Sequence, residues 1–202
     1  MPGPSTPPAS SVERKGNVQW AEYTEHIAKL LIKSPSHCTA GEAKQRVPPR
    51  PGFYAIFVDS ADSLRPPFDK ILRDQQTDLL YIGIATRSLV KRLVNKDLHH
   101  RSPSSFFRSL GAVLEFRPRV GSLKGKKNQC NYNFRPFEGE IIQWIEKHLT
   151  IRWICASPAL GAEEATAIKQ YRPILNIQHN PNPAPELIAL REDCRSLARR
   201  AL

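Results

Sequence analysis

The sequence has few of the features that would place it in a well-defined structural class. Its 202 residues include four cysteines, and none of them forms a Cys-x-x-Cys pair, which argues against a zinc site or a disulfide framework. This cysteine usage favours a reducing, cytoplasmic location. No apolar run reaches the ~18 residues that a membrane-spanning helix needs. The first eleven residues have neither a basic start nor an apolar stretch, so they predict no signal peptide, and we expect no membrane partner.

Acidic residues are scarce relative to basic ones. The chain has 30 Lys and Arg against 19 Asp and Glu, which gives a formal net charge of +11. Such an excess favours polyanionic partners through long-range attraction and counterion release. A soluble domain with a merely cationic surface explains the charge about equally well. Hydrophobic residues make up 40% of the chain, which is enough for an ordinary core, so composition alone leaves the function open.

Shifts in composition divide the chain into four predicted parts. Residues 1–17 are rich in Pro and Ser and are predicted to form a disordered tail, because they cannot bury enough apolar surface. Residues 18–50 are predicted to form an N-terminal helix and linker, which pack on the core because the apolar face of the helix needs cover. The main domain is placed at 51–178, with a basic insertion at 117–136. Residues 179–202 are predicted to be a linker and a final helix.

The apolar pattern predicts an α/β (α+β) fold. Residues 52–58, "GFYAIFV", are apolar at nearly every position, as in a strand that is covered on both faces. Further strands are predicted at 79–85 and 150–156, and helices at 88–98 and 137–149. We therefore expect a small, three-stranded, largely antiparallel sheet flanked by helices.

Several polar and glycine residues stand at characteristic places on these elements. The first strand carries Gly-x-Tyr, the second carries Tyr-x-Gly, and an arginine lies on the helix that follows. A later helix reads "EATAIKQYRPILN" (164–176), with a glutamate twelve residues before an asparagine. In chain order these residues are Gly52, Tyr54, Tyr81, Gly83, Arg92, Glu164 and Asn176. Over roughly residues 50–178 the pattern resembles the GIY-YIG nuclease superfamily, including the incision subunit of nucleotide-excision repair and the GIY-YIG restriction and homing endonucleases.

The resemblance implies a role for each matching residue in phosphodiester hydrolysis. Glu164 would be the metal ligand, holding Mg²⁺ (or Mn²⁺) together with water and substrate oxygens. Arg92 would bind the scissile phosphate. Tyr54 and Tyr81 would lie against the attacking water and the phosphate, and Asn176 would fix the geometry around them. Outside the motif, the same residue types are most often a solvated carboxylate, a surface arginine, core tyrosines and a turn asparagine.

Three residues in or beside the motif are given no part in the chemistry. Gly52 belongs to the structural motif, and Gly83 is expected to let the chain turn closely from strand to helix. Glu163, next to the motif glutamate, is expected to be a solvated helix residue. Gly52 and Gly83 are thus assigned to the scaffold rather than to the chemistry.

The sequence leaves the general base open, because Ile84 stands where many members of this superfamily carry Lys. If the helix is α-helical, Arg92, Lys96 and His99 share one face. His99 or His100, with an ordinary pKa of ~6.5, is then a candidate base. A polar helix end explains the two histidines about equally well.

A set of basic residues is predicted to bind nucleic acid. Within the loop 117–136, Tyr132 and Phe134 are expected to be available for stacking, although a solvated charged loop is nearly as consistent with the sequence. The predicted contacts are Lys91, Lys96, Arg117, Arg119, Lys124, Lys126 and Lys127.

The sequence therefore predicts a divalent-metal-dependent endonuclease acting on DNA. The alternative is a basic nucleic-acid-binding module that keeps the scaffold but does not cut, and Ile84 is its best support. RNA is an open alternative to DNA as the substrate. The sequence does not distinguish restriction, repair and mobile-element roles, and it does not define the oligomeric state.

Overall fold

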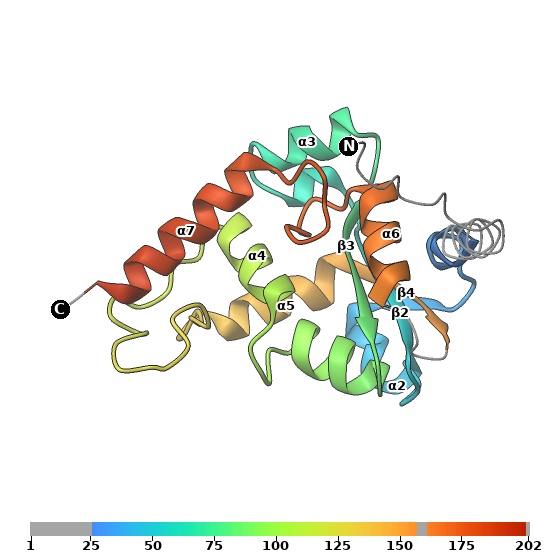
Figure 1. Cartoon of the computed structure of the whole chain (residues 1–202), viewed down its shortest axis with the longest axis horizontal. Coiled ribbons are helices and arrows are strands. Elements are labelled where there is room, and N and C mark those ends of the chain that lie inside the picture. The colour runs from blue at the N-terminus through green and yellow to red at the C-terminus, as the bar shows by residue number, and fades with distance from the viewer. Residues whose placement is uncertain (1–25, 157–160, 201–202) are drawn as a thin grey trace, which may run out of the picture.

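The computed structural model describes residues 26–156 and 161–200 (Figure 1). The predicted tail, 1–17, lies outside these residues. One antiparallel sheet has the strand order β1-β4-β2-β3. Its strands are β1 (His37–Thr39), β2 (Gly52–Val58), β3 (Leu79–Ala85) and β4 (Leu149–Cys155). The predicted α/β fold with an antiparallel sheet is confirmed, but the sheet has four strands rather than three.

The strand missing from the prediction is β1, which pairs with β4. It has only three residues and follows the Pro-containing segment "SPS", so it carries no alternating pattern long enough to recognise. Cys38 faces the core between two exposed neighbours. The short strand therefore covers one edge of the sheet, and β3 forms the other edge.

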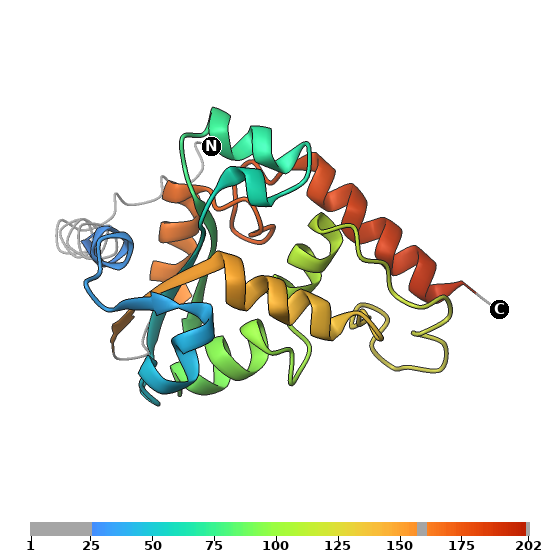
Figure 2. The same cartoon turned by 180° about the vertical axis from the view of Figure 1, so that it is seen from behind.

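Helices surround the sheet (Figures 1 and 2). Residues 26–32 are helical. The other elements are η1 (Ala40–Glu42), α2 (Ala43–Arg46), η2 (Ala61–Ser63), α3 (Phe68–Asp74), η3 (Val90–Leu98), α4 (Ser105–Val113), α5 (Glu138–His148), α6 (Gly161–Tyr171) and α7 (Pro185–Arg199). Of the described helices, none is both long and apolar enough to cross a membrane.

Two apolar cores lie on opposite faces of the sheet. Successive residues of β2 point to opposite faces, and all seven are buried. The larger core joins Tyr54 and Ile56 to side chains of η3, α4, α5 and α7. The smaller core joins Phe53 to α6 and to the helical residues 26–32, whose Leu31 is buried. A strand covered on both faces explains why "GFYAIFV" has no polar position.

The segment 117–136 packs against α7. The sequence predicted the segment as a basic loop and α7 as a separate final helix, without a contact between them. The backbone N–H of Leu123 donates to the carbonyl of Ala198 at 2.9 Å. Tyr132 and Phe134 are buried, with their rings edge to face at 5.6 Å. The prediction that these two rings are available for stacking on nucleic acid is therefore wrong. They are core residues, buried in one cluster with side chains of α4 and α7.

Candidate active site

The edge strand β3 is the platform of the site. An edge strand presents unpaired N–H and C=O groups, and here the turn after α6 satisfies several of them. Asn176 accepts a hydrogen bond from the Ile82 N–H at 2.9 Å and donates to the Ile82 carbonyl at 3.0 Å. The Leu175 N–H donates to the carbonyl of Leu80 at 2.9 Å. The side chain of Asn176 thus makes the hydrogen bonds that a neighbouring strand would make, and it holds the turn after α6 against β3.

We expect Asn176→Ala to destabilise the fold before it affects any chemistry. The substitution leaves two buried backbone groups of Ile82 without partners, and each costs about 1–3 kcal/mol. Urea unfolding should therefore show a free energy of unfolding lower by about 2–4 kcal/mol. The exposed Asn182 provides the control, Asn182→Ala. Equal stability of the two variants would contradict the proposal that Asn176 holds the turn after α6 against β3.

Gly83 is required by the tyrosine on the neighbouring strand. Tyr54 is opposite Gly83 in the antiparallel pair, and a Cβ built on Gly83 would overlap the Tyr54 hydroxyl. The expected reason for this glycine, a close turn from strand to helix, is wrong, because Gly83 lies inside β3. Gly52 has a similar function, since a Cβ there would overlap the carbonyl oxygen of Ile154 on β4.

Gly83→Ala should displace the Tyr54 phenol. We expect the free energy of unfolding to fall by about 1–3 kcal/mol, as in other overpacked cores. Gly139→Ala is the matched control, because nothing lies within 4 Å of its added Cβ on α5 and helix propensity then favours alanine by up to about 1 kcal/mol. Guanidinium unfolding of both variants tests this. A neutral Gly83→Ala variant would mean that the phenol can move away without cost.

The helix after β3 is a π-helix rather than the predicted α-helix. Element η3 runs over Val90–Leu98, and the N–H of His99 donates to the carbonyl of Val94, five residues earlier, at 3.1 Å. In a π-helix residues i and i+5 stack along the axis. This register places Asp97 beside Arg92, with Arg92 Nη1 at 2.8 Å from Asp97 Oδ1. Such wide turns are frequent at functional sites.

Asp97 is the central residue that sequence reasoning missed. Its side chain is fully buried and accepts three hydrogen bonds. The donors are the Tyr54 hydroxyl, the Ser104 hydroxyl at 2.7 Å and Arg92. Ser104 also caps α4 by accepting from the Phe107 N–H, so the carboxylate connects β2, η3 and α4. Its only sequence signal is that it is the one acidic residue of η3.

The pKa values around Asp97 reflect burial and opposing charges. Burial raises the pKa of Asp97, while the charge of Arg92 and the hydrogen bonds from Ser104 and Tyr54 act against that rise. Burial disfavours the charged form of Arg92, but its negative neighbours, Asp97 and Glu164 among them, outweigh this and raise its pKa. Arg92 is therefore a permanent cation held in place by a buried acceptor.

A cavity of about 500 Å³ borders this network through Arg92. It brings together four of the predicted site residues, from β3, η3, α6 and the turn that follows α6. Its lining residues are Tyr81, Ile84, Arg92, Ser105, Ser109, Glu164, Ile168, Leu175, Asn176, Ile177, Gln178, His179 and Arg191. Tyr54 is not among them: it is fully buried beneath the cavity wall, with its ring centroid 6.4 Å from that of Tyr81.

The phenol of Tyr81 is held in its neutral form. Burial raises its pKa, and the charge of Asp97 adds to the rise, whereas the charge of Arg92 and a hydrogen bond from it act in the opposite direction. The net shift is upward. Tyr81 can therefore orient a water molecule or a phosphate by hydrogen bonding, but on its own it is a weak base.

Glu164 is the carboxylate that faces the cavity. Burial raises its pKa, while the charges of Arg92 and His179 and the backbone N–H of Ile84 lower it. The net rise means that the negative charge of Glu164 is not fully compensated by its neighbours. A hard oxygen ligand with excess negative charge is suited to a divalent cation that keeps most of its waters.

The metal ligands beyond Glu164 would have to come from water and substrate. Across 26–156 and 161–200, no group of three His, Cys, Asp or Glu residues is arranged to hold a metal ion. Asp97 is fully buried under the cavity and occupied by three donors. The donor set therefore fits one weakly held Mg²⁺ or Mn²⁺ rather than a closed, all-protein site.

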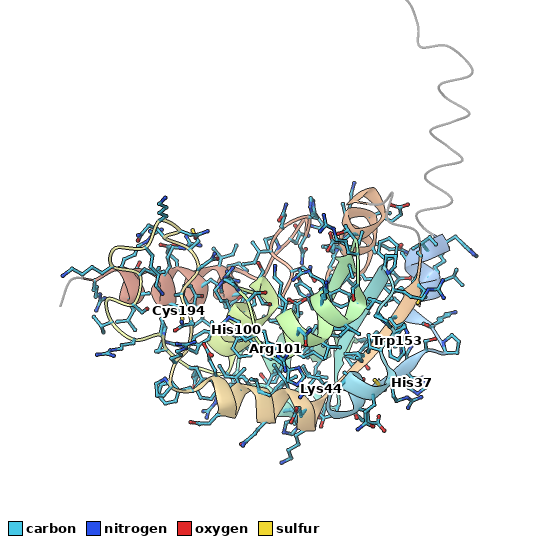
Figure 3. All side chains as sticks on the ribbon, turned by 90° about the horizontal axis from the view of Figure 1, so that it is seen from below. His37, Lys44, His100, Arg101, Trp153 and Cys194 are labelled. Atoms are coloured by element: carbon cyan, nitrogen blue, oxygen red, sulfur yellow. The ribbon has the colours of Figure 1, made fainter. Side chains whose placement is uncertain are left out.

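The two histidines do not face the cavity. His99 lies near the carbonyl of Val94 at 2.8 Å and near the carboxylate of Glu146 at 3.3 Å, on the side of α5. The predicted face shared with Arg92 required an α-helical register, which the π-helix lacks. His100 (labelled in Figure 3) stacks on Phe107 at 4.2 Å, and burial lowers its pKa. The structure thus places His99 and His100 in packing positions away from the site.

Glu163 is also placed differently from expectation. The sequence predicted a solvated helix residue at position 163, but only 2% of the surface of Glu163 is exposed. It is therefore unsuitable as a surface control for its neighbour, and an exposed glutamate such as Glu140 on α5 serves better.

The predicted nucleic-acid contacts fall into two groups. Lys91 and Lys96 line a shallow groove together with Arg87, and this groove shares Ile84 and Arg92 with the cavity. The second group, Arg117, Arg119, Lys124, Lys126 and Lys127, belongs to the loop 117–136, which lies beside α7 at the end of the molecule opposite the sheet (Figure 1). Only the first group continues the charged surface of the cavity.

Comparison with protein families gives one match. Residues 52–196 match the sequence model of a family described as the GIY-YIG catalytic domain. The matched segment covers the sheet from β2 onward, the cavity and most of α7, and so extends beyond the 50–178 expected from the motif. Comparisons with curated proteins and with solved structures give no match.

Proposed function

Because the chain belongs to the GIY-YIG catalytic domain family, we propose that it is a divalent-metal-dependent endonuclease that hydrolyses DNA phosphodiester bonds. The family is one of nucleases, so the substrate is a nucleic acid. We further propose that the preferred nucleic acid is DNA and that the reaction needs Mg²⁺ or Mn²⁺. The observation that supports it most strongly is the meeting of Tyr81, Arg92 and Glu164 around one cavity.

In the proposed mechanism, Arg92 binds the scissile phosphate. Its guanidinium offers charged hydrogen bonds where negative charge develops during hydrolysis. Asp97 fixes the orientation of Arg92 through the 2.8 Å contact, so the cation is organised before the substrate binds. The Tyr81 hydroxyl then orients the attacking water or a phosphate oxygen.

Glu164, which lines the cavity from α6, would hold the divalent cation. The metal, when bound, would stabilise negative charge on the phosphate and on the leaving oxygen. Glu164 itself supplies one oxygen ligand, and the Ile84 N–H helps to orient this carboxylate. Asn176 keeps β3 and the turn after α6 together, so it is a positioning residue rather than a catalytic one.

A second candidate function is binding without cleavage. It is favoured by two observations: Ile84 replaces the lysine of many relatives, and burial holds the pKa of Tyr81 well above its ordinary value. Without a positioned base, the site could still bind phosphates through Arg92 and the groove. Such a module would retain nucleic acid in a metal-independent way and leave it intact.

A panel of defined substrates tests the proposed function. Purified protein is incubated with labelled duplex, nicked and branched DNA and with RNA of the same sequence, with Mg²⁺, with Mn²⁺ and with EDTA, and the cut positions are mapped. We expect metal-dependent cuts in DNA. Cuts confined to RNA would reassign the substrate, whereas retention of every substrate without any cut would favour the binding module.

A further inference from the structure

Three arginines, Arg108, Arg191 and Arg195, lie close together where α4 packs on α7. Arg108 lies on α4, and Arg191 and Arg195 lie one turn apart on α7. The guanidinium of Arg108 is 5.9 Å from the centre of the Tyr132 ring. Burial lowers the pKa of Arg108, and the charges of Arg191 and Arg195 lower it further, so the three cations are close enough to repel one another. Figure 3 labels Cys194, which marks this part of α7.

Carboxylates neutralise only part of the positive charge of these three arginines. Arg195 pairs with Glu192 at 2.5 Å. Arg108 donates to the side-chain oxygen of Asn131 at 3.0 Å, and Arg191 donates to the hydroxyl of Ser109 at 2.7 Å. Within the described part of the chain, neither Arg108 nor Arg191 forms an ion pair with a carboxylate.

Unused donors remain in all three side chains. The Nε atoms of Arg108, Arg191 and Arg195 are buried and have no hydrogen-bond partner among the described residues. Only 7% of the surface of Arg108 is exposed. A buried cation without an acidic partner is costly, and a bound anion would remove that cost by accepting charged hydrogen bonds.

The cluster opens onto the candidate active site through Arg191. This residue lines the same cavity as Arg92 and Glu164, although it comes from α7, whereas Arg92 comes from η3. The cavity therefore has one arginine above Asp97 and a second arginine at its α7 wall. A nucleic-acid strand carries a phosphate at every nucleotide, so two arginines from different elements can contact different phosphates of one strand.

We propose that Arg191, supported by Arg108 and Arg195, forms a second phosphate subsite that binds a non-scissile phosphate of the nucleic-acid strand in the cavity. The inference rests on the proposed function, because it assumes that this cavity receives a nucleic acid. It assigns α7 to substrate binding and positioning. Arg92 contacts the phosphate that reacts, and Arg191 fixes the position of the strand relative to it.

Binding measured without metal separates this subsite from cleavage. A fluorescein-labelled 16-nucleotide DNA, as a single strand and as a duplex, is titrated in EDTA with wild type, Arg191→Gln and Arg195→Gln. The control is Arg135→Gln, whose side chain is 80% exposed. We expect Kd to rise at least about tenfold for Arg191→Gln, since a hydrogen bond to a charged group contributes about 1.5–3 kcal/mol and each 1.4 kcal/mol changes Kd tenfold. The slope of log K against log salt should decrease by about 0.7 for the single strand or 0.9 for the duplex.

Inorganic phosphate provides the second readout. At matched ionic strength, phosphate should raise the Tm of wild type more than that of Arg191→Gln or Arg195→Gln, because only an intact subsite gains stability from the anion. Arg195→Gln, in which a partly exposed residue is changed, serves if Arg191→Gln does not fold. Affinity and salt slope equal to those of Arg135→Gln, with the same phosphate effect in every variant, would overturn the proposal. Because no cleavage is measured, a chain that never cuts DNA could still show the subsite, and an active nuclease could lack it.

Discussion

Arg92→Ala is expected to lose at least about 100-fold in cleavage rate, the usual effect of removing one donor that stabilises developing charge. DNA binding should weaken far less, since one phosphate contact is a small part of a footprint that also includes the groove lined by Lys91 and Lys96. The measurement compares single-turnover cleavage with binding in EDTA. Arg101→Ala, at an exposed position just after η3, is the matched control for loss of one arginine charge.

The Arg92→Ala variant also breaks the ion pair with Asp97, so a loss of cleavage has to be separated from a loss of stability. Without Arg92, the buried carboxylate of Asp97 loses its ion-pair partner, and breaking a buried pair in this way costs about 3–5 kcal/mol. The double variant Arg92→Ala/Asp97→Asn removes the unpaired charge and should recover part of the lost stability, but not the cleavage. Cleavage restored in the double variant would show that Arg92 acts through the fold. Binding lost as strongly as cleavage would assign Arg92 to the general basic surface.

Glu164→Gln is expected to reduce cleavage by about 1000-fold or more, because the stabilisation supplied by a metal amounts to several kcal/mol and each 1.36 kcal/mol changes a rate tenfold. Glutamine keeps the shape and one oxygen but removes the charge that holds the cation. The fold should tolerate the change, since burial already raises the pKa of Glu164 and a neutral side chain relieves that cost. Rates at increasing Mn²⁺ concentration, with folding checked by circular dichroism, provide the test.

Two further glutamine variants define the specificity of this effect. Glu140→Gln, at an exposed site on α5, should cleave at the wild-type rate. Glu163→Gln changes a buried residue and is expected to alter stability more than chemistry. Full activity in folded Glu164→Gln would contradict the metal site proposed here, and loss in Glu163→Gln alone would move the metal ligand by one residue.

The sequence predicted the parts of the fold that depend on short-range patterns. The apolar runs located β2 and β3 at their observed bounds and β4 to within one residue. The motif spacing identified Tyr81, Arg92 and Glu164, which line one cavity although 83 residues separate the first from the last. Such motifs can be recognised in a sequence because each strand, helix or turn carries a particular residue type at a fixed position along it.

The remaining features depend on packing that the pattern does not encode. Asp97 meets Arg92 only in a π-helical register, and the sequence of η3 has the apolar spacing of an ordinary helix. Tyr132 and Phe134 look like exposed loop aromatics until α4 and α7 are placed around them. Arg191 reaches the cavity only because α7 packs on α4, a contact between segments about 80 residues apart.

The most direct test of the central claim is the conversion of supercoiled plasmid to open circles by the purified wild-type protein, with Mg²⁺ or Mn²⁺ and with EDTA. The proposed site predicts nicking that requires the metal, rises with its concentration over a range typical of weak sites, and disappears in EDTA. Plasmid that is bound but never nicked in either metal, or nicking that persists unchanged in EDTA, would contradict it.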